Sequence, residues 1–356
     1  MPRKSDKYSV VGKRQPRLDG ALKVTGRSQF TDDVVLPGML HGKIVRSAIP
    51  SGKILNIDTS RAEKLPGVKA VITHKDTGGL MVGIDQLLLR DDSVNYFGDE
   101  IAAVAAVDDD TAAEAAELIT VEYEPISPLL SVEEAAAGGA RVIHDHLEDN
   151  QADDITMNFG DAEKAFAESD HIRVDEYTIN PSHSSYTEQH IVLADYSLPD
   201  KLTIWTPIQS SVLIQMNMAF KLNLPVSKVR IMNLNTGGAF CGRGSDKAHH
   251  YIAALLSRRT GKPVKIRCTA DEEFLVYRGG GKYSFKFKTG ATNDGILKAI
   301  DAELRLDSGA YMDAQFFVLR FIGFSLQMLY KLDASRFNGK LFYTNNHPYM
   351  FHHGTG

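Results

Sequence analysis

IAAVAAVDDDTAAEAAELITVEYEP, residues 101–125, carries the strongest fold signal in the chain. Its first seven residues are an apolar run, which predicts a short buried strand. Thr111 and Glu114 have the spacing of a capping box, and the alanines around them favour a helix. Residues 119–124 resume the pattern of a strand. A strand, a helix and a second strand in succession predict a mixed unit of helices and strands at this point.

The segments before this stretch extend the same unit toward the N-terminus. HGKIVRSAI at 41–49 and VKAVITH at 68–74 are typical of short strands. We therefore predict one domain over residues 19–130. Residues 1–18 are polar and without periodicity, which indicates a loose N-terminal arm.

A change of character after this domain predicts a boundary. Residues 131–156 are rich in Ala, Gly and acid, so we expect a connecting segment there. His144 and His146 lie in it, and we interpret them as a solvated loop pair because metal ligands would need partners nearby. A second domain is predicted over residues 157–356, incomplete at its C-terminus. The fold class is α+β in two domains.

Helix and strand signals recur in the second domain. A helix is predicted over residues 246–259, with Gly261 as its C′ residue and Pro263 preventing its continuation. ATNDG at 291–295 tolerates the positive φ of a tight turn, which predicts a β-hairpin. Further helices are expected over residues 160–171 and 211–223, the latter between strands at 201–208 and 226–234.

The composition is that of a globular protein, with 356 residues of which 43% are hydrophobic and 24% charged. Acids and bases are mixed for a net charge of −5, which argues against a nucleic-acid-binding surface. No apolar run reaches the ~18 residues of a membrane span, and the basic N-terminus lacks the apolar core of a secretory signal. Cys241 and Cys268 are the only cysteines, so we exclude a disulfide framework and expect a cytoplasmic location. Two thiolates also cannot hold an iron–sulfur cluster.

The most informative motif for function is NTGGAFCGRGSDKAHH, residues 235–250, between a predicted strand and a predicted helix. Glycine and alanine surround one aromatic residue, Phe240. Glycine lets the backbone approach a ligand, and N–H groups beside a helix N-terminus favour an anion such as a phosphate or a metal oxo group. A tight turn without a ligand explains the same residues equally well. The motif is neither a P-loop nor a dinucleotide fingerprint.

Other residues are candidates on their chemistry alone. Glu188, in TEQH, is a candidate base or hydrogen-bonding residue, although pairing with a nearby Arg is the simpler interpretation. Gln209 lies at a predicted strand end, where both site residues and ordinary loop residues occur. His183 and His190 suit either a metal or the core. A Cys241 thiolate would need a base beside it, so catalysis by this cysteine is disfavoured.

A series of segments in constant order resembles the xanthine dehydrogenase and aldehyde oxidase family of molybdenum hydroxylases over almost the whole chain. The resemblance implies an α/β hammerhead domain followed by the first part of a molybdopterin-binding domain. The segments are RLDGALKVTGRSQFTDDVVLPGMLHGKIVRS, YFGDEIAAVAAVDDDTAAEAAELITVEYEPISP, GDAEKAFAESDH, SYTEQHIVLADY, VSKVRIMNLNTGGAFCGR, TGKPVKIRCTADEEFLVYR, DGILKAIDAELRLDSGAYMD and LFYTNN.

The resemblance also implies roles for single residues. Gln209 is similar in position to a glutamine beside the molybdenum oxo group, and Phe240 to an aromatic that lines the substrate pocket. Glu188 corresponds to an acid near that pocket. Arg320, in FVLRFIGF, falls near an arginine that stabilises developing negative charge. No side chain is implied as a direct metal ligand. The implied cofactor contacts are Gln209, Gly238, Ala239, Phe240, Cys241, Gly242, Arg243 and His353.

The chain departs from the family pattern in two motifs. Ala239, Cys241 and Arg243 stand where the usual loop of the family has two glycines and a lysine. With these replacements, the loop of this chain resembles that of the 4-hydroxybenzoyl-coenzyme A reductase and nicotinate dehydrogenase branches. Gly244 stands where purine-acting members carry an acid. His353 replaces the arginine of a terminal cofactor-binding motif, and a histidine lacks the planar fork of arginine.

The family's chemistry implies further components. Members bear molybdenum on a molybdopterin, in some cases as the cytosine dinucleotide, and hydroxylate N-heterocycles or aldehydes with oxygen from water. One branch reduces an aryl-coenzyme A. Electrons leave through [2Fe–2S] clusters to FAD, so we expect partner subunits that carry both groups. Family members with one molybdenum subunit are longer, which implies a second molybdopterin-binding polypeptide or a missing C-terminal half.

Two rival functions remain open at this stage. One is a truncated, non-catalytic relative or scaffold subunit that binds a partner without molybdenum. The other is a zinc or thiol enzyme that would use His183, His190 and Cys241. For the hydroxylase we expect a small-molecule substrate, and neither nucleic acid nor membrane insertion.

Overall fold

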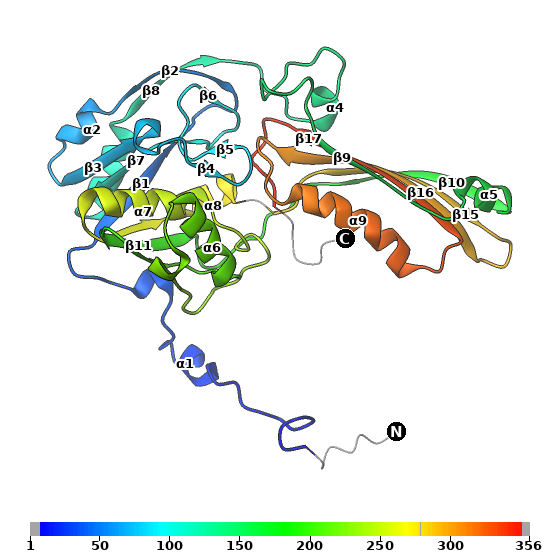
Figure 1. Cartoon of the computed structure of the whole chain (residues 1–356), viewed down its shortest axis with the longest axis horizontal. Helices are drawn as coiled ribbons and strands as arrows, with labels where there is room; N and C mark the ends of the chain where they lie inside the picture. Colours follow the sequence, from blue (N-terminus) through cyan, green and yellow to red (C-terminus); the bar gives the residue numbers. More distant parts are fainter. Residues whose placement is uncertain (1–7, 278, 351–356) are drawn as a thin grey trace.

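The chain forms two lobes side by side, a rounded one and an elongated one (Figure 1). The computed structural model describes residues 8–277 and 279–350. The rounded lobe contains a seven-stranded and a three-stranded sheet, and the elongated lobe is built on a five-stranded sheet with helix α9 (Gln315–Leu329) along it. Helices and mostly antiparallel strands in separate layers confirm the predicted α+β class. None of the helices in the described residues is long and apolar enough to cross a membrane.

The seven-stranded sheet draws its strands from both sides of the predicted domain connection. Its centre is the parallel pair β1 (Leu40–Arg46) and β14 (Val264–Arg267), in which Leu40 lies opposite Val264. Strand pairing therefore unites the two predicted domains in one sheet. The order is β13 (Val229–Met232), β12 (Lys201–Trp205), β11 (Ile191–Leu198), β14, β1, β7 (Glu100–Ala106) and β3 (Val68–Thr73).

Strand β7 confirms the predicted buried strand at residues 101–107. Every residue of β7 is buried, and its side chains alternate between two cores. Ala103 and Ala105 face the core under α6 (Ser211–Lys221) and α7 (Ala248–Thr260), whereas Val104 faces the core under α2 (Ser60–Lys64) and α3 (Asp109–Glu117). Because helices cover both faces of the sheet, the sequence of β7 is continuously apolar and does not alternate.

The termini of two helices test the predicted capping residues. The predicted capping box of Thr111 and Glu114 is wrong, because α3 begins earlier. Asp108 is its N-cap, and the Asp108 carboxylate accepts a hydrogen bond of 2.8 Å from the Thr111 backbone N–H. At the end of α7, Gly261 adopts a left-handed φ of 64°, as predicted for its C-terminal cap.

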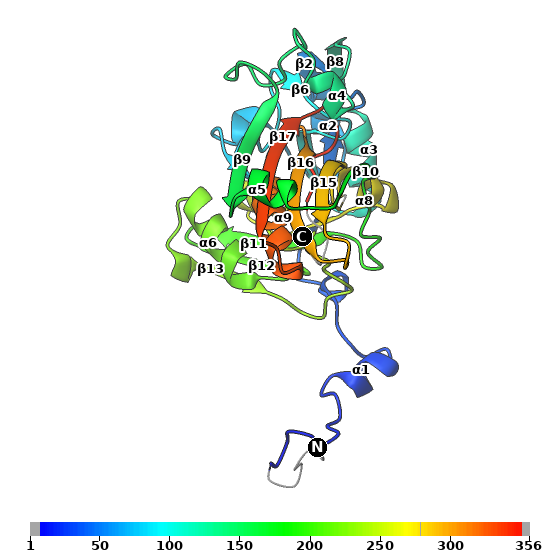
Figure 2. The same ribbon diagram turned by 90° about the vertical axis from the view of Figure 1, so that its right-hand side faces the viewer.

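The elongated lobe is a curved sheet covered on one face by α9 (Figure 2). Strands β15 (Tyr283–Ala291) and β16 (Leu297–Gly309) form the predicted hairpin, with Gly295 at a φ of 83°. Strand β17 (Ala334–Tyr343) pairs in parallel with β16, and α9 is the crossover between them. Helix α9 packs Val318, Leu319 and Ile322 against this sheet. The outer strands are β10 (His171–Ile179) and β9 (Gln151–Phe159), with α5 (Ala162–Ala167) between them in sequence.

The remaining elements are short. The three-stranded sheet has the order β6 (Ser93–Val94), β2 (Gly52–Asp58) and β8 (Thr120–Pro125), and a two-stranded ribbon pairs β4 (Met81–Val82) with β5 (Gln86–Leu87). The others are α1 (Gly20–Val24), α4 (Val132–Ala135), α8 (Ala270–Val276) and the 3-10 turns Thr31–Asp33, His74–Asp76 and Val226–Lys228.

Among the described residues, the exposed N-terminal segment continues past residue 18. Residues 8–18 are exposed, α1 buries no residue, and Thr31 is the first buried side chain. Figure 1 shows this segment extending away from the rounded lobe.

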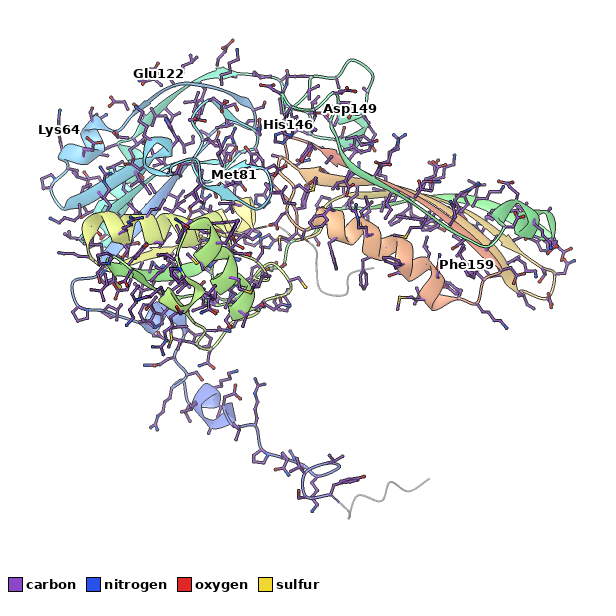
Figure 3. The ribbon with its side chains drawn as sticks, in the orientation of Figure 1. Lys64, Met81, Glu122, His146, Asp149 and Phe159 are labelled. Atoms are coloured by element: carbon purple, nitrogen blue, oxygen red, sulfur yellow. The ribbon has the colours of Figure 1, made fainter. Side chains whose placement is uncertain are left out.

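The predicted connecting segment lies between the lobes, where Figure 3 labels His146 and Asp149. His146 is exposed, as predicted, but the prediction that His144 is solvated is wrong. The His144 ring is buried against Tyr311 and Tyr343, and its Nε2 lies 2.8 Å from the Ala310 carbonyl oxygen. This contact between distant segments has no signal in the local sequence.

Candidate functional site

The glycine-rich loop between β13 and α7 has a constrained backbone. Phe240 and Cys241 adopt left-handed φ angles of 38° and 67° in succession, which non-glycine residues rarely do. A Cβ atom at Gly242 would lie 1.8 Å from the Tyr186 hydroxyl, so only glycine fits there. The Phe240 side chain is about half exposed at the surface of the loop. The loop is therefore held in one shape and presents its aromatic residue outward.

A buried ion pair supports this loop from beneath. The Arg243 side chain is almost fully buried, and its Nη1 lies 3.0 Å from Glu188 Oε2 and 3.0 Å from the Gly238 carbonyl oxygen. Glu188 Oε2 also accepts a hydrogen bond of 2.6 Å from the Gly237 N–H. The guanidinium of Arg243 lies 4.7 Å from the centre of the Tyr186 ring. The simpler interpretation of Glu188, pairing with an arginine, agrees with this geometry, and the Arg243 side chain is directed under the loop.

Gln209 lies against the same loop. It follows β12, and its backbone N–H donates a 3.0 Å hydrogen bond to the Arg243 carbonyl oxygen. Its side chain hydrogen-bonds the Cys241 thiol. Burial raises the pKa of Cys241, and the hydrogen bond with Gln209 offsets only part of that rise. The thiol is protonated at neutral pH, in agreement with the prediction that disfavoured a Cys241 nucleophile.

The structure does not bring Arg320, one of the predicted site residues, to this loop. Arg320 lies on α9, where its guanidinium pairs with Asp153 of β9 and donates 2.8 Å to the Phe316 carbonyl oxygen. Among the described residues, none of the loop contacts Arg320. The next residue, Phe321, is exposed. His353 lies outside the described residues.

A cluster of buried histidines lies close to the loop, and sequence reasoning missed it. His190 Nδ1 lies 2.9 Å from each carboxylate oxygen of Glu273, and the His190 ring stacks on Tyr277 at 3.8 Å. The Tyr277 hydroxyl lies within hydrogen-bond distance, 2.6 Å, of His249 Nδ1, and the His250 ring lies 4.1 Å from that of His249. His190 directly precedes β11, the other two histidines lie on α7, and Glu273 and Tyr277 lie on or directly after α8, so only tertiary folding assembles the cluster.

The histidines of this cluster are neutral. Burial lowers the pKa of His190 and of His250 to about 4. Burial alone would raise the pKa of Glu273, but its hydrogen bonds from His190 bring the pKa below its ordinary value. At neutral pH His190 therefore donates its Nδ1 proton to an ionised Glu273. The cluster orients rings beneath the site and adds no positive charge to it.

The geometry gives no support to a zinc site. His183 Nδ1 accepts a hydrogen bond of 2.8 Å from the Ser185 N–H, and its Nε2 donates at 2.8 Å to the Glu273 carbonyl oxygen. Within the residues that the structure describes, no three side chains of the ligand types gather to hold a metal ion.

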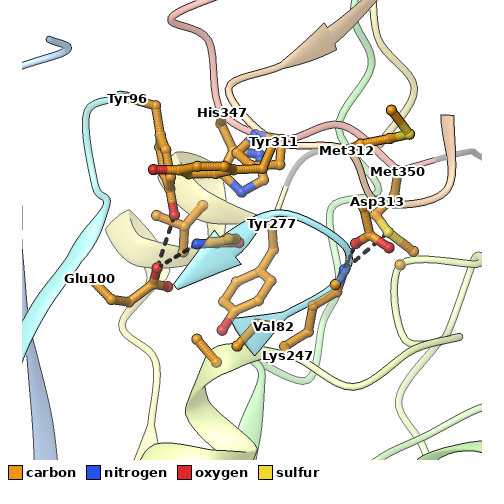
Figure 4. Close-up of a pocket in the computed structure, with 16 residues that line it drawn as sticks. Val82, Tyr96, Glu100, Lys247, Tyr277, Tyr311, Met312, Asp313, His347 and Met350 are labelled. Atoms are coloured by element: carbon orange, nitrogen blue, oxygen red, sulfur yellow. Dashed lines mark hydrogen bonds and ion pairs between the residues drawn. The ribbon is translucent and has the colours of Figure 1, made fainter. Parts of the chain in front are cut away.

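A cavity beside the loop lies where the two lobes meet (Figure 4). It encloses about 620 Å³, its open mouth included, and Gly242 of the loop is part of its wall. Glu100 in this wall pairs with Arg46 at 2.8 Å, and Lys247 pairs with Asp313. Glu100 and Lys247, two charged residues that Figure 4 labels in this wall, thus each already have an ion-pair partner in the protein.

Family models match both parts of the chain. Residues 25–127 match the aldehyde oxidase and xanthine dehydrogenase a/b hammerhead domain. Residues 143–356 match the molybdopterin cofactor-binding domain. Neither match includes the exposed residues before position 25.

Relatives of the chain are similar along nearly all of its length. It is 35% identical over 336 residues to a probable subunit of xanthine dehydrogenase from Bacillus subtilis, an alignment that covers 93% of this chain and 44% of the relative. It is 32% identical over 344 residues to the nicotinate dehydrogenase large molybdopterin subunit of Eubacterium barkeri, or 95% of this chain and 80% of that one. The chain thus spans less than half of the first relative and most of the second.

Solved structures share the fold. Quinoline 2-oxidoreductase from Pseudomonas putida 86 superposes with a TM-score of 0.90 at 25% identity, covering 97% of this chain and 46% of that chain. Aldehyde oxidoreductase from Desulfovibrio gigas gives a TM-score of 0.88 at 26% identity, covering 97% and 40% respectively. Both lobes and their arrangement are therefore those of a part of these longer enzymes.

Proposed function

Because the chain belongs to the aldehyde oxidase and xanthine dehydrogenase family, with its hammerhead and molybdopterin cofactor-binding domains, we propose that it holds one side of a molybdenum cofactor in an oxidoreductase complex. The observation that carries the proposal is the position of Gln209, which comes from the end of β12 and lies against the glycine-rich loop. A backbone loop with an amide side chain beside it offers hydrogen bonds to an anionic or oxo-bearing group.

The residues present fit such a group. Phe240 and Cys241 turn the backbone sharply through two left-handed φ angles, so the loop backbone can approach a ligand closely. Arg243 neutralises Glu188 beneath the loop, so the nearest carboxylate does not repel an anion. We assign the backbone of residues 238–242 and the Gln209 carboxamide to the cofactor, and the Phe240 ring to the substrate space.

The molybdenum centre, when bound, supplies the redox chemistry that side chains lack. This chain's own part is to bind and orient. The Glu188–Arg243 pair holds the loop in place. The loop backbone and the Gln209 carboxamide would hold and orient the cofactor through hydrogen bonds. We propose that the substrate is a small N-heterocycle or an aldehyde that is hydroxylated, or an aryl-coenzyme A that is reduced.

The rest of the proposed assembly lies on other parts of the complex. We propose that a further molybdopterin-binding part completes the site and that partner subunits carry the [2Fe–2S] clusters and FAD. The cytosine dinucleotide form of the cofactor and a role for His353 belong to the same proposal. Neither Cys241 nor Cys268 forms a disulfide, which supports a cytoplasmic location.

Replacing Gln209 by Ala in the assembled complex tests the proposal. Loss of one preorganised donor costs about 100-fold in kcat in comparable sites, so we expect a fall of that order with unchanged molybdenum content. Gln215→Ala is a matched control, because the Gln215 side chain donates its hydrogen bond to the Val229 carbonyl oxygen of β13 and not to a residue of the glycine-rich loop. Full turnover by Gln209→Ala would exclude the assigned role. A native complex without molybdenum would favour the non-catalytic scaffold instead.

A further inference from the structure

The side of α9 that faces away from the elongated sheet is apolar along its length. Phe317, Phe321, Phe324 and Met328 are separated by four, three and four positions, so they lie on one side of the helix. We call these four residues the α9 stripe. All are exposed, Phe324 by 58% and Met328 by 75%. The opposite side of α9 is buried against β17, β16 and β9.

A helix of this composition is normally covered on both sides. Among the fifteen residues of α9 the single charged one is Arg320, and Asp153 already pairs with it. Helices that are apolar all round are buried in proteins, because apolar surface left in water is unfavourable. The α9 stripe is continuous, unlike the single exposed apolar residues that most proteins carry, and therefore marks an interaction surface.

The N-terminal end of α9 is fixed beside the candidate site. Asp313, two residues before α9, pairs with Lys247 at the end of the glycine-rich loop. The Gln315 amide donates 2.8 Å to the Met350 carbonyl oxygen, and the Met350 sulfur lies 3.0 Å from Lys247 Nζ. A polypeptide that covers the α9 stripe would therefore extend along a helix whose first residues lie next to the loop.

We infer that the α9 stripe is the docking surface for the remaining part of the molybdenum subunit, and this inference rests on the proposed function. The relative lengths point to this occupant. The match to quinoline 2-oxidoreductase covers 97% of this chain but only 46% of that enzyme's chain. More than half of such a chain is further polypeptide that must pack somewhere on this fold. A large apolar stripe without unpaired charge suits a protein core and not an anionic or cationic ligand.

The experiment uses the complex from the protein's own source. Native mass spectrometry compares the wild type with Phe324→Lys/Met328→Lys, and peptide sequencing identifies any polypeptide that aligns with the uncovered part of the relatives. We expect the amount of that polypeptide bound to the double variant to be at least 10-fold lower than the amount bound to the wild type. Leu55→Lys is the matched control, an exposed leucine on β2 in the other lobe, and it should retain the polypeptide. Circular dichroism of both variants verifies that the chain itself is folded.

Oxidative footprinting of Met328 tests the same surface without a variant. It also applies if the remaining part of the molybdenum subunit is continuous with this chain, so that no separate polypeptide can be lost. In the assembled wild-type complex Met328 should be at least 10-fold slower to oxidise than in the isolated chain. Equal oxidation, intact assembly of the double variant, or release of a second copy of this chain would overturn the docking surface while leaving the proposed function standing. A wild-type complex with the polypeptide but without molybdenum would overturn the proposed function instead, and the inference with it.

Discussion

At the scale of single residues, the Glu188–Arg243 pair lies beneath the loop, with the Arg243 side chain almost fully buried and that of Glu188 mostly buried. Removing one partner of a buried pair leaves the other charge without compensation. We predict that Glu188→Ala lowers the free energy of unfolding by about 3 kcal/mol in urea denaturation. Asp200→Ala, which breaks an exposed pair with Lys228, should change it by less than about 0.5 kcal/mol. Equal losses in the two variants would show that the buried pair contributes no more than a surface one.

Asp99 makes stability depend on pH. Burial raises its pKa to about 7, although Arg90 opposes the rise. The folded state therefore keeps a proton that the unfolded chain releases near pH 4, and the stability from this proton is lost as pH rises toward 7. We predict that Asp99→Asn has a similar Tm to the wild type at pH 5 and a higher Tm than the wild type at pH 8. Thermal unfolding of both proteins at the two pH values measures this, and a constant difference in Tm would contradict it.

The sequence indicated some residues of the candidate site but not their contacts. Gln209 and Glu188 were selected from short local motifs, and the structure brings both to the glycine-rich loop. The pairing of His190 with Glu273 and of Arg320 with Asp153 joins segments that are far apart in the chain. A side chain's sequence neighbours carry no record of which distant group it contacts, so these pairs could not be predicted.

Among the elements, those with a strong apolar pattern were predicted well. The run at 101–107, the helix that ends at Gly261 and the hairpin at ATNDG all occur. The start of α3 was wrong because three consecutive aspartates precede Thr111, and several residues there have capping chemistry. Backbone conformation decides between them, and Asp108 is the residue with the extended φ of −147°.

The cap of α3 is open to a direct test. Replacing an N-cap aspartate by alanine costs about 1 kcal/mol, so Asp108→Ala should lower the free energy of unfolding by that amount. Glu114→Ala, which removes the other member of the predicted box, should leave it within about 0.5 kcal/mol of the wild type. Chemical denaturation of both variants decides between the two caps. A larger loss of stability in Glu114→Ala than in Asp108→Ala would favour the capping box predicted from the sequence.

At the scale of the whole molecule, strand pairing is what the sequence did not reveal. Each strand's pattern indicates which face is buried, but it does not identify the neighbouring strand. Division of the chain near residues 131–156 therefore separates β1 from β14, which the structure joins. The rounded lobe thus contains strands from both predicted segments, β1 from the first and β14 from the second.

This pairing predicts the behaviour of a fragment. Residues 1–130 alone would lack β14 beside β1 and the helices α6 and α7 that cover Ala103 and Ala105. We expect this fragment to show no cooperative thermal transition by circular dichroism and poor dispersion of amide signals by NMR. The full chain should show a cooperative transition under the same conditions. A sharp transition in the fragment would indicate that the first segment is stable without the rest.

The pairing of Leu40 with Val264 also sets an order of events during synthesis. A ribosome adds about 5–20 residues per second, so β1 leaves the exit tunnel on the order of ten to forty seconds before β14 exists. During that interval the central edge of the future sheet has no partner, and unpaired edges recruit other strands. Nascent chains of this protein are therefore expected to need a chaperone at the tunnel exit, and slower translation would lengthen the time at risk.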